Sequence, residues 1–385
     1  MSDKQVNNRL QSELKLRKDN QQYRQIHLYE GHDFCSNDYL GLAAKTPDID
    51  TYSAAGSTGS RLISGHHQSA EDFELLIAKA QGFENSLLFN SGYTANLGLI
   101  ACLGKEGDLL LLDSLIHASS IDGARLSKAT KSPFAHNDLS DLDAKLTSFN
   151  QTRTSESQQA FVIVESLYSM DGDYAPLNEL SQLCKKYGAN LIVDEAHALG
   201  IVGDHGCGLV SKLNLQKEVF ATVYTFGKAM GCHGAVIASS NLLRDYLINY
   251  CRSFIYTTAL SPQTISTLSQ AYHQLQNADQ QREVLNNNIA HLVDRIKTQT
   301  LANNMHWLDS QSPIQALMVG NNADAKKLQS KLTEEGFAIK AILSPTVPVG
   351  TERLRVCLHS SNTTQQIDHL IEIVSRFSSE IGLTN

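Results

Sequence analysis

Reactive side chains follow four short apolar runs in the middle of the chain. Continuous apolar runs of this length are typical of strands that are buried on both faces of a parallel sheet. Ligands bind at the carboxyl ends of such strands. Because all four ends carry polar groups, the pattern predicts one shared site in an α/β fold. The runs are 109–112, 161–164, 191–193 and 219–224, and they lead to Asp113 and His117, Glu165, Ser166 and Ser169, Asp194, Glu195 and His197, and Thr225 and Lys228.

Asp194 comes directly after Leu-Ile-Val and is therefore expected to be buried. A buried carboxylate is costly unless a cation compensates its charge. Two readings remain open from the residues alone. One is a salt bridge to an Arg or Lys in the core, and the other is a bound cation, either a metal ion or a protonated heterocycle.

Lys228 lies between two glycines, Gly227 and Gly231, just after an apolar strand. A Walker A phosphate loop would require glycine at position 222 and Ser or Thr at 229, where this chain has Thr and Ala. The other interpretation is a lysine that forms an imine, with an amine made reactive by burial and nearby positive charge.

Two further features could bind ligands. Loops of small residues at 56–61 and 90–93 could cradle a phosphate with their backbone N–H groups. Asp194, His197, His205 and Cys207 lie close together in the sequence, but no HExxH motif occurs. We therefore expect no metal, and a metal-dependent hydrolase remains an alternative from a different class.

The composition narrows the functional class. The chain has 385 residues, a net charge of −8 and seven scattered cysteines without a CxxC motif. A nucleic-acid partner is not expected, because such proteins carry a clustered basic excess. We expect a soluble, cytoplasmic protein with reduced thiols and no membrane partner, since neither a signal peptide nor a long apolar span is evident.

The remaining elements must position the strand ends. The residues 177–187 predict a helix that stops at Gly188 and completes a βαβ unit. We also predict a helix over 4–24, a helix that begins with Ser69 and Asp72 as a capping pair, a surface loop at 147–159 and a strand at 235–238. After residue 240 a long helical region precedes short strands, so we divide the chain into an N-terminal helix and arm at 1–42, a large domain at 43–250 and a small α+β domain at 251–385.

Eight segments, in this order and spacing, resemble the α-oxoamine synthase family of pyridoxal-phosphate (PLP) enzymes, which have the type I aminotransferase fold. The resemblance covers nearly the whole chain and implies a mostly parallel sheet with helices on both faces. The segments are SNDYLGL (36–42), GSTGSR (56–61), FNSGYTANLG (89–98), IHASSIDGARLS (116–127), ESLYSMDGDYAPL (165–177), VDEAHALGIVGDHGCG (193–208), TFGKAMGCHGA (225–235) and PTVPVGTERLRV (345–356).

The resemblance implies a role for each site residue. Lys228 would form the Schiff base with PLP, Asp194 would hold the pyridinium N–H, and His117 would stack on the ring. The other cofactor contacts would be His197, Ser169, Gly92, Tyr93 and Thr225, with Ser57 or Thr58 entering from a second subunit. Substrate contacts would come from Arg355, for the amino-acid carboxylate, and from Arg24, Thr346 and His117.

The resemblance also implies an activity. Within the family the motifs are most similar to members that condense L-alanine with a pimeloyl thioester, carried by CoA or by a carrier protein, and that act as homodimers. Alternatives are a sister enzyme that uses glycine and an inactive partner subunit, although such a subunit need not retain Lys228 and Asp194. One departure concerns the acyl chain: Leu343 and Ser344 stand where the family often has a basic residue, so Lys340 is the candidate for the distal carboxylate.

Overall fold

The chain forms two compact units. The computed structural model describes all residues except 1, 21, 27, 46–53, 303–304 and 383–385. The larger unit comprises Asn37–Ser169 and Asp173–Glu283, and the smaller unit comprises Met1–Ser36, Met170–Gly172 and Val284–Asn385. No helix among the described residues is both long and apolar enough to cross a membrane.

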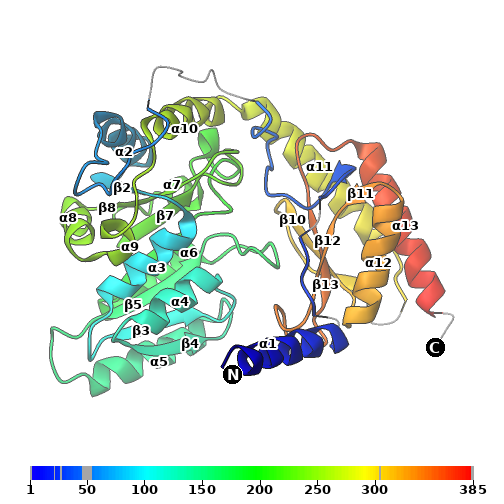
Figure 1. Ribbon diagram of the computed structural model, residues 1–385, viewed down its shortest axis with the longest axis horizontal. Coiled ribbons are helices and arrows are strands. Elements are labelled where there is room, and N and C mark those ends of the chain that lie inside the picture. Colours follow the sequence, from blue (N-terminus) through cyan, green and yellow to red (C-terminus); the bar gives the residue numbers. More distant parts are fainter. Residues whose placement is uncertain (1, 21, 27, 46–53, 303–304, 383–385) are drawn as a thin grey trace. The chain divides into compact units, whose positions relative to one another are not determined.

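A seven-stranded sheet forms the centre of the larger unit, in the order β2-β8-β7-β6-β5-β3-β4 (Figure 1). Strand β8 is antiparallel to β7 and β2, whereas the neighbouring pairs from β7 to β4 are parallel. The four apolar runs are therefore adjacent strands, as predicted, and their carboxyl ends lie at one edge. The bounds are β2 (Asn85–Phe89), β3 (Leu109–Asp113), β4 (Thr130–Phe134), β5 (Ala160–Glu165), β6 (Asn190–Asp194), β7 (Ala221–Thr225) and β8 (Ala235–Ser239).

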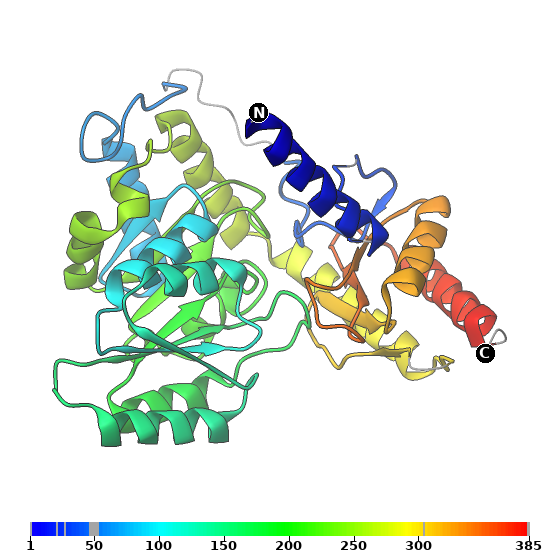
Figure 2. The ribbon, with the colours of Figure 1, turned by 60° about the horizontal axis from the view of Figure 1, so that its bottom comes forward.

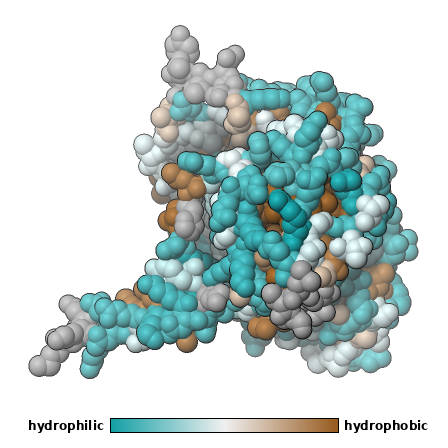
Figure 3. Space-filling model, turned by 90° about the vertical axis from the view of Figure 1, so that its right-hand side faces the viewer, coloured by the Kyte–Doolittle hydropathy of each residue, from teal (hydrophilic) through white to brown (hydrophobic). Residues whose placement is uncertain are grey.

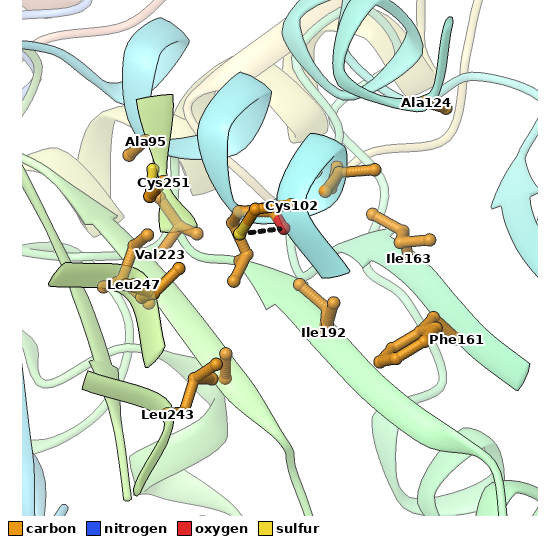
Figure 4. Close-up of a cluster of buried hydrophobic side chains, with 14 of the residues drawn as sticks. Ala95, Cys102, Ala124, Phe161, Ile163, Ile192, Val223, Leu243, Leu247 and Cys251 are labelled. Atoms are coloured by element: carbon orange, nitrogen blue, oxygen red, sulfur yellow. Dashed lines mark hydrogen bonds between the residues drawn. The ribbon is translucent and has the colours of Figure 1, made fainter. Parts of the chain in front are cut away.

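Helices cover both faces of this sheet. Phe161 and Ile163 of β5 join one buried cluster with side chains from α3, α8 and α9 (Figure 4), while the alternating residues Val162 and Val164 are equally buried on the other face. Helix α4 packs on α3 on one face of the sheet, and α5 and α6 pack together on the other (Figure 2). The helices are α2 (Gln68–Gln81), α3 (Gly92–Leu103), α4 (Ala118–Leu126), α5 (Leu139–Thr152), α6 (Leu177–Tyr187), η1 (Asp204–Gly206), α7 (Leu209–Lys212), α8 (Asn241–Tyr250), α9 (Arg252–Ile255) and α10 (Pro262–Gln276).

The smaller unit combines short strands with helices, which confirms the α+β prediction. Its main sheet has the order β12-β13-β10-β9 with antiparallel pairs, and β1 pairs with β11 in parallel. The face that carries α12 and α13 is largely hydrophilic (Figure 3). The bounds are α1 (Ser2–Asp19), β1 (His32–Asp33), α11 (Asp279–Lys297, which starts in the larger unit), β9 (His306–Trp307), β10 (Ile314–Met318), α12 (Asn322–Glu334), β11 (Phe337–Ala338), β12 (Lys340–Ile342), β13 (Arg353–Cys357) and α13 (Thr364–Gly382).

The units are divided differently from the predicted domains. The predicted boundary after residue 250 separates α10 from the large domain, but α10 packs on α2 and buries Ile265 and Leu268 within the larger unit. The division therefore falls after Glu283. Residues of the predicted N-terminal arm up to Ser36 group with the smaller unit, because β1 pairs with β11.

Three local predictions were wrong. The loop predicted at 147–159 is helical up to Thr152, since Leu142 and Leu146 give α5 a buried stripe that its polar composition conceals. His67, not Ser69, precedes α2 as its N-cap, and no side chain caps that helix end. The α1 helix ends at Asp19, earlier than predicted. The predicted end of α6 is confirmed, since Gly188 adopts the left-handed conformation (φ 65°) that terminates the helix.

Candidate active site

A cavity of about 220 Å³ lies at the carboxyl ends of the parallel strands of the larger unit. Its lining includes Glu165, at the end of β5, and seven of the residues predicted to contact a cofactor. They come from the start of α3 (Gly92 and Tyr93), from the residue before α4 (His117), from the end of β6 (Asp194 and His197), and from the end of β7 (Thr225 and Lys228). The adjacent parallel strands thus bring together residues that are more than 100 positions apart.

Asp194 is buried, with 5% of its surface exposed. Its Oδ2 accepts a hydrogen bond from Asn96 Nδ2 at 2.7 Å, and its Oδ1 accepts one from the backbone N–H of Ala196 at 2.8 Å. Both donors are neutral, and no salt bridge to Asp194 is formed within the described ranges. Of the two readings left open by the sequence, the geometry favours a cation that belongs to a bound molecule.

His117 is joined to Asp194 through neutral side chains. Its Nδ1 lies 2.7 Å from Ser119 Oγ and accepts the backbone N–H of Ser119 at 3.2 Å, while Asn96 Nδ2 also donates to Ser119 Oγ at 3.1 Å. Burial lowers the pKa of His117, opposed by Asp194 and assisted by Lys228. A neutral imidazole that accepts at Nδ1 carries its proton on Nε2, so His117 can donate a hydrogen bond to an oxygen.

His197 and Lys228 are also held by neighbouring polar groups. The hydroxyl of Tyr39 lies 2.7 Å from His197 Nδ1 and donates to Asn37 Oδ1 at 3.1 Å. This arrangement holds the imidazole ring of His197 in place. Lys228 Nζ donates to Thr225 Oγ1 at 3.5 Å, which orients the amine from within its own strand–turn segment.

The start of α3 can bind an anion. Ser91 caps the helix by accepting the N–H of Thr94, and the free N–H groups of the first turn follow it. Gly92 is required here, because a Cβ on this residue would lie 2.4 Å from Cγ2 of Thr225. The hydroxyl of Tyr93 donates to Asp122 in a short hydrogen bond. The close packing leaves backbone N–H groups at the cavity wall, as phosphate sites at helix N-termini require.

Other predicted site residues lie outside the cavity lining. Ser169 donates its backbone N–H to Glu165 Oε2 at 3.2 Å. Arg24, Thr346 and Arg355 belong to the smaller unit, where Arg24 Nη2 donates to Thr346 Oγ1 at 3.4 Å. Arg355 of β13 is 9% exposed and donates from Nη1 to Cys357 Sγ at 2.8 Å.

The small-residue loop at 56–61 makes structural contacts within this chain. Ser57 Oγ donates to the carbonyl of Leu260 at 2.6 Å, and Arg61 pairs with the buried Glu74 at 2.8 Å. His205 of η1, one of the residues considered for a metal, lies with its Nδ1 3.5 Å from Asp279 Oδ2 at the start of α11. Among the described residues, no group of three or more His, Cys, Asp or Glu is arranged to hold a metal ion.

Sequence reasoning gave no role to two residues that support the site, Asn96 and Tyr39. Asn96 bridges Asp194 and Ser119, and Tyr39 supports His197. Asn96 could have been found as a polar residue in the otherwise apolar helix α3. Tyr39 offered no comparable signal, since its segment reaches His197 only through the tertiary fold.

Comparisons with known proteins agree with this geometry. The family described as aminotransferase class I and II matches residues 30–374. The chain is 37% identical over 357 residues to an 8-amino-7-oxononanoate synthase of Lysinibacillus sphaericus, covering 91% of this chain and 89% of that protein. It is 38% identical over 370 residues to the corresponding protein of Emericella nidulans, covering 89% and 88%.

Solved structures show the same fold. A serine palmitoyltransferase from S. paucimobilis with a bound PLP–myriocin aldimine has a TM-score of 0.84 at 27% identity, covering 92% of this chain and 89% of that chain. An 8-amino-7-oxononanoate synthase from Francisella tularensis has a TM-score of 0.76 at 29% identity, covering 91% and 98%.

Proposed function

The chain belongs to the aminotransferase class I and II family, and on that premise we propose that it condenses L-alanine with a pimeloyl thioester. The products would be 8-amino-7-oxononanoate, carbon dioxide and the free thiol carrier. The main support for the proposed chemistry is that Lys228 and the buried Asp194 line the same cavity. The substrate assignment is supported by the relatives named 8-amino-7-oxononanoate synthase.

The cofactor is pyridoxal 5′-phosphate, and the residues of the cavity fit it. Asp194 lacks a cationic partner among the described residues and would hold the protonated ring nitrogen. The N-terminus of α3 would bind the phosphate, and Lys228 would bind the aldehyde carbon. When bound, the protonated ring draws electrons away from the Cα of the amino acid.

The residues of the chain would then move and hold protons. Asp194 keeps the proton on the ring nitrogen, because its negative charge compensates the pyridinium in a buried place. The amine of Lys228 would be the base for the Cα proton. The Nε2–H of His117 would polarise the carbonyl oxygen of the thioester.

The smaller unit would supply the substrate contacts. We propose that Arg355 binds the carboxylate of alanine and that Arg24 and Thr346, which share a hydrogen bond, contact the acyl chain. Lys340 of β12 lies with its Nζ 5.9 Å from the ring centre of Tyr29 and would meet the distal carboxylate of the pimeloyl group. Lys340→Ala should therefore raise KM for the acyl donor and leave alanine binding unchanged.

The experiment that tests the proposal compares wild type with Lys228→Ala. Wild type should show the absorption band of a lysine–cofactor imine, and borohydride should fix the cofactor to the protein. The variant should fold, lose the imine band and lose activity by several orders of magnitude. The control is Lys212→Ala, a lysine of α7 on the surface. A Lys228→Ala protein that keeps the band and more than about 1% of the activity would refute the assignment of this lysine.

A spectral titration with L-alanine, glycine and L-serine tests the substrate. Because one methyl group is worth only about 1–3 kcal/mol in a pocket, glycine should bind more weakly but measurably. Faster condensation of glycine with acetyl- or succinyl-CoA, or of serine with a long acyl-CoA, would assign a sister activity. The similarity to serine palmitoyltransferase structures makes serine the first competitor to test.

We also propose a homodimer in which Ser57 or Thr58 of each chain reaches the site of the other. Thr58 is exposed and adopts a left-handed conformation (φ 54°), so it is held in a defined loop at the surface. Sedimentation equilibrium of the holoenzyme measures the mass directly. A monomeric, fully active enzyme would exclude a shared site.

A further inference from the structure

Glu165 is a second buried acid in the cavity, to which the mechanism above assigns no role. It is the last residue of β5, it pairs in register with Asp194 of β6, and only 2% of its surface is exposed. It lines the cavity together with His117, Asp194 and Lys228. A glutamate in this position faces whatever molecule occupies the cavity.

The two carboxyl oxygens of Glu165 differ in their surroundings. Oε2 accepts the backbone N–H of Ser169 at 3.2 Å, whereas Oε1 is buried and has no hydrogen-bond partner. An ionised carboxylate would leave negative charge on this unpartnered oxygen, which is strongly unfavourable. A neutral acid instead places an O–H group there, and that group needs an acceptor.

Glu195, at the end of the neighbouring strand, shows what a purely structural buried acid looks like. Its Oε2 accepts the N–H of Leu209 at 3.0 Å, and its Oε1 accepts the N–H of Val210 at 2.6 Å. Both oxygens are therefore used to hold the start of α7. Since Glu165 has no such partner on Oε1, its free oxygen is available to a ligand.

We propose that Glu165 is a ligand-binding residue that is kept as a neutral carboxylic acid and donates its Oε1 proton to an oxygen of the molecule bound in the cavity. The ligand class is a cofactor or substrate with an oxygen acceptor near Asp194. The proposal rests on the function proposed above, because it takes the cavity to be the cofactor site.

The charges around Glu165 support this protonation state. Burial and the neighbouring Asp194 together raise its pKa to about 8, against the opposing effects of Lys228 and of the backbone N–H groups of His117 and Ser169. The phenol of Tyr168, three residues further on, is a further titratable group near it. Above pH 8 an ionised Glu165 would add a second negative charge beside Asp194, and an anionic ligand should then bind more weakly.

Infrared difference spectroscopy tests the protonation state without any ligand. The spectrum of wild type minus Glu165→Gln, on cofactor-free protein, should contain the C=O stretch of a protonated carboxylic acid at pH 6.5. This band should disappear as the pH rises through about 8. The control is wild type minus Glu179→Gln, whose side chain lies exposed on α6. Absence of a Glu165 band at pH 6.5 would overturn the proposal.

Binding of pyridoxamine 5′-phosphate tests the contact, because this amine cannot form an imine with Lys228. Calorimetry should give a Kd for Glu165→Gln within about threefold of wild type, and a Kd for Glu165→Leu about tenfold weaker, which is the range for one lost hydrogen bond. Wild type should bind more weakly at pH 9 than at pH 7, and Glu165→Gln should not. Circular dichroism establishes that both variants are folded.

The two proposals fail in different ways. If wild type does not bind pyridoxamine 5′-phosphate, the proposed function fails, and the infrared band alone then decides whether Glu165 is neutral. If wild type binds it and a folded Glu165→Leu protein binds equally well, the contact is refuted while the proposed function stands. If the Kd of Glu165→Gln kept the pH dependence of wild type, the contact of Glu165 with the ligand would also be refuted.

Discussion

Two clusters of buried acids lie at the carboxyl ends of strands in the same sheet. They differ in the groups that face their carboxylates. Asp113, at the end of β3, is 1% exposed and accepts His136 Nδ1 at 2.8 Å and the N–H groups of Leu115 and Asn137. The other nitrogen of His136 lies 2.8 Å from Asp173 Oδ2. Here the protein itself supplies the cation that the buried carboxylate requires.

The cluster of Asp194 and Glu165 has no such cation in contact among the described residues. Asp194 accepts only neutral donors, and Glu165 keeps one oxygen without a partner. The charge that faces each buried acid therefore distinguishes a structural acid from a functional one. A buried carboxylate that faces a cation of the protein stabilises the fold, and one that lacks such a cation and also lines a cavity marks a binding site.

The largest effect is expected on activity, from a substitution in the cluster of Asp194 and Glu165. Asp194→Asn should fold and bind the cofactor but lose activity by roughly 10²–10⁴-fold, because a neutral amide cannot keep the ring nitrogen protonated. Measurements of kcat and of thermal unfolding on the same preparation check this. A stable Asp194→Asn variant with normal turnover would show that Asp194 has a structural role like that of Asp113. The proposed difference between the two clusters would then be refuted.

A substitution in the cluster of Asp113 and His136 is expected to lower stability and to leave cofactor binding nearly unchanged. His136→Gln should lower the free energy of unfolding by about 3 kcal/mol, since it leaves the buried Asp113 without its cation. Urea unfolding measures this loss. The affinity for pyridoxamine 5′-phosphate at 25 °C should change little in the folded fraction, and a large loss of affinity without a loss of stability would contradict the assignment.

The pH dependence of the free energy of unfolding tests whether His136 is the cation that compensates Asp113. The two aspartates raise the pKa of His136 to about 10, against the opposing effect of burial. Because this folded-state pKa lies above the ordinary value of 6.5, the stabilisation is complete below pH 6.5 and is lost as the pH rises through 10. Unfolding free energies of wild type minus those of His136→Gln should therefore shrink between pH 6.5 and 10. A constant difference would mean that His136 is not the titrating group.

The smallest effect concerns the residue beside this cluster. Asn137 and Asn214 both adopt left-handed conformations, with φ of 53° and 58°, but Asn137 also donates from Nδ2 to Asp173 at 2.7 Å. Replacement by Ala strains both backbones, so Asn137→Ala should cost about 1 kcal/mol more than Asn214→Ala, the worth of one hydrogen bond. Equal losses in urea unfolding would show that the Asp173 contact adds nothing.

Much of the fold was visible in local sequence patterns. The apolar runs predicted β3, β5, β6 and β7, and the αL residue Gly188 marked the end of α6. Two strands of the larger sheet were missed: β4 is a polar edge strand that contains Pro133, and β2 lies in a stretch with several small polar residues. Such patterns report the burial of a face, so they fail where an element buries little or where its buried stripe is narrow, as in α5.

Local sequence patterns were sufficient to predict which residues stand at the strand ends, because strand length and polarity are local properties. They therefore predicted that Asp194 and Lys228 share a site. Only the tertiary structure decided what each acid is paired with, since the partners of Asp113, Glu165 and Asp194 come from other elements of the chain. A sequence states that a carboxylate is buried, but the charge that it faces depends on how distant segments meet in space.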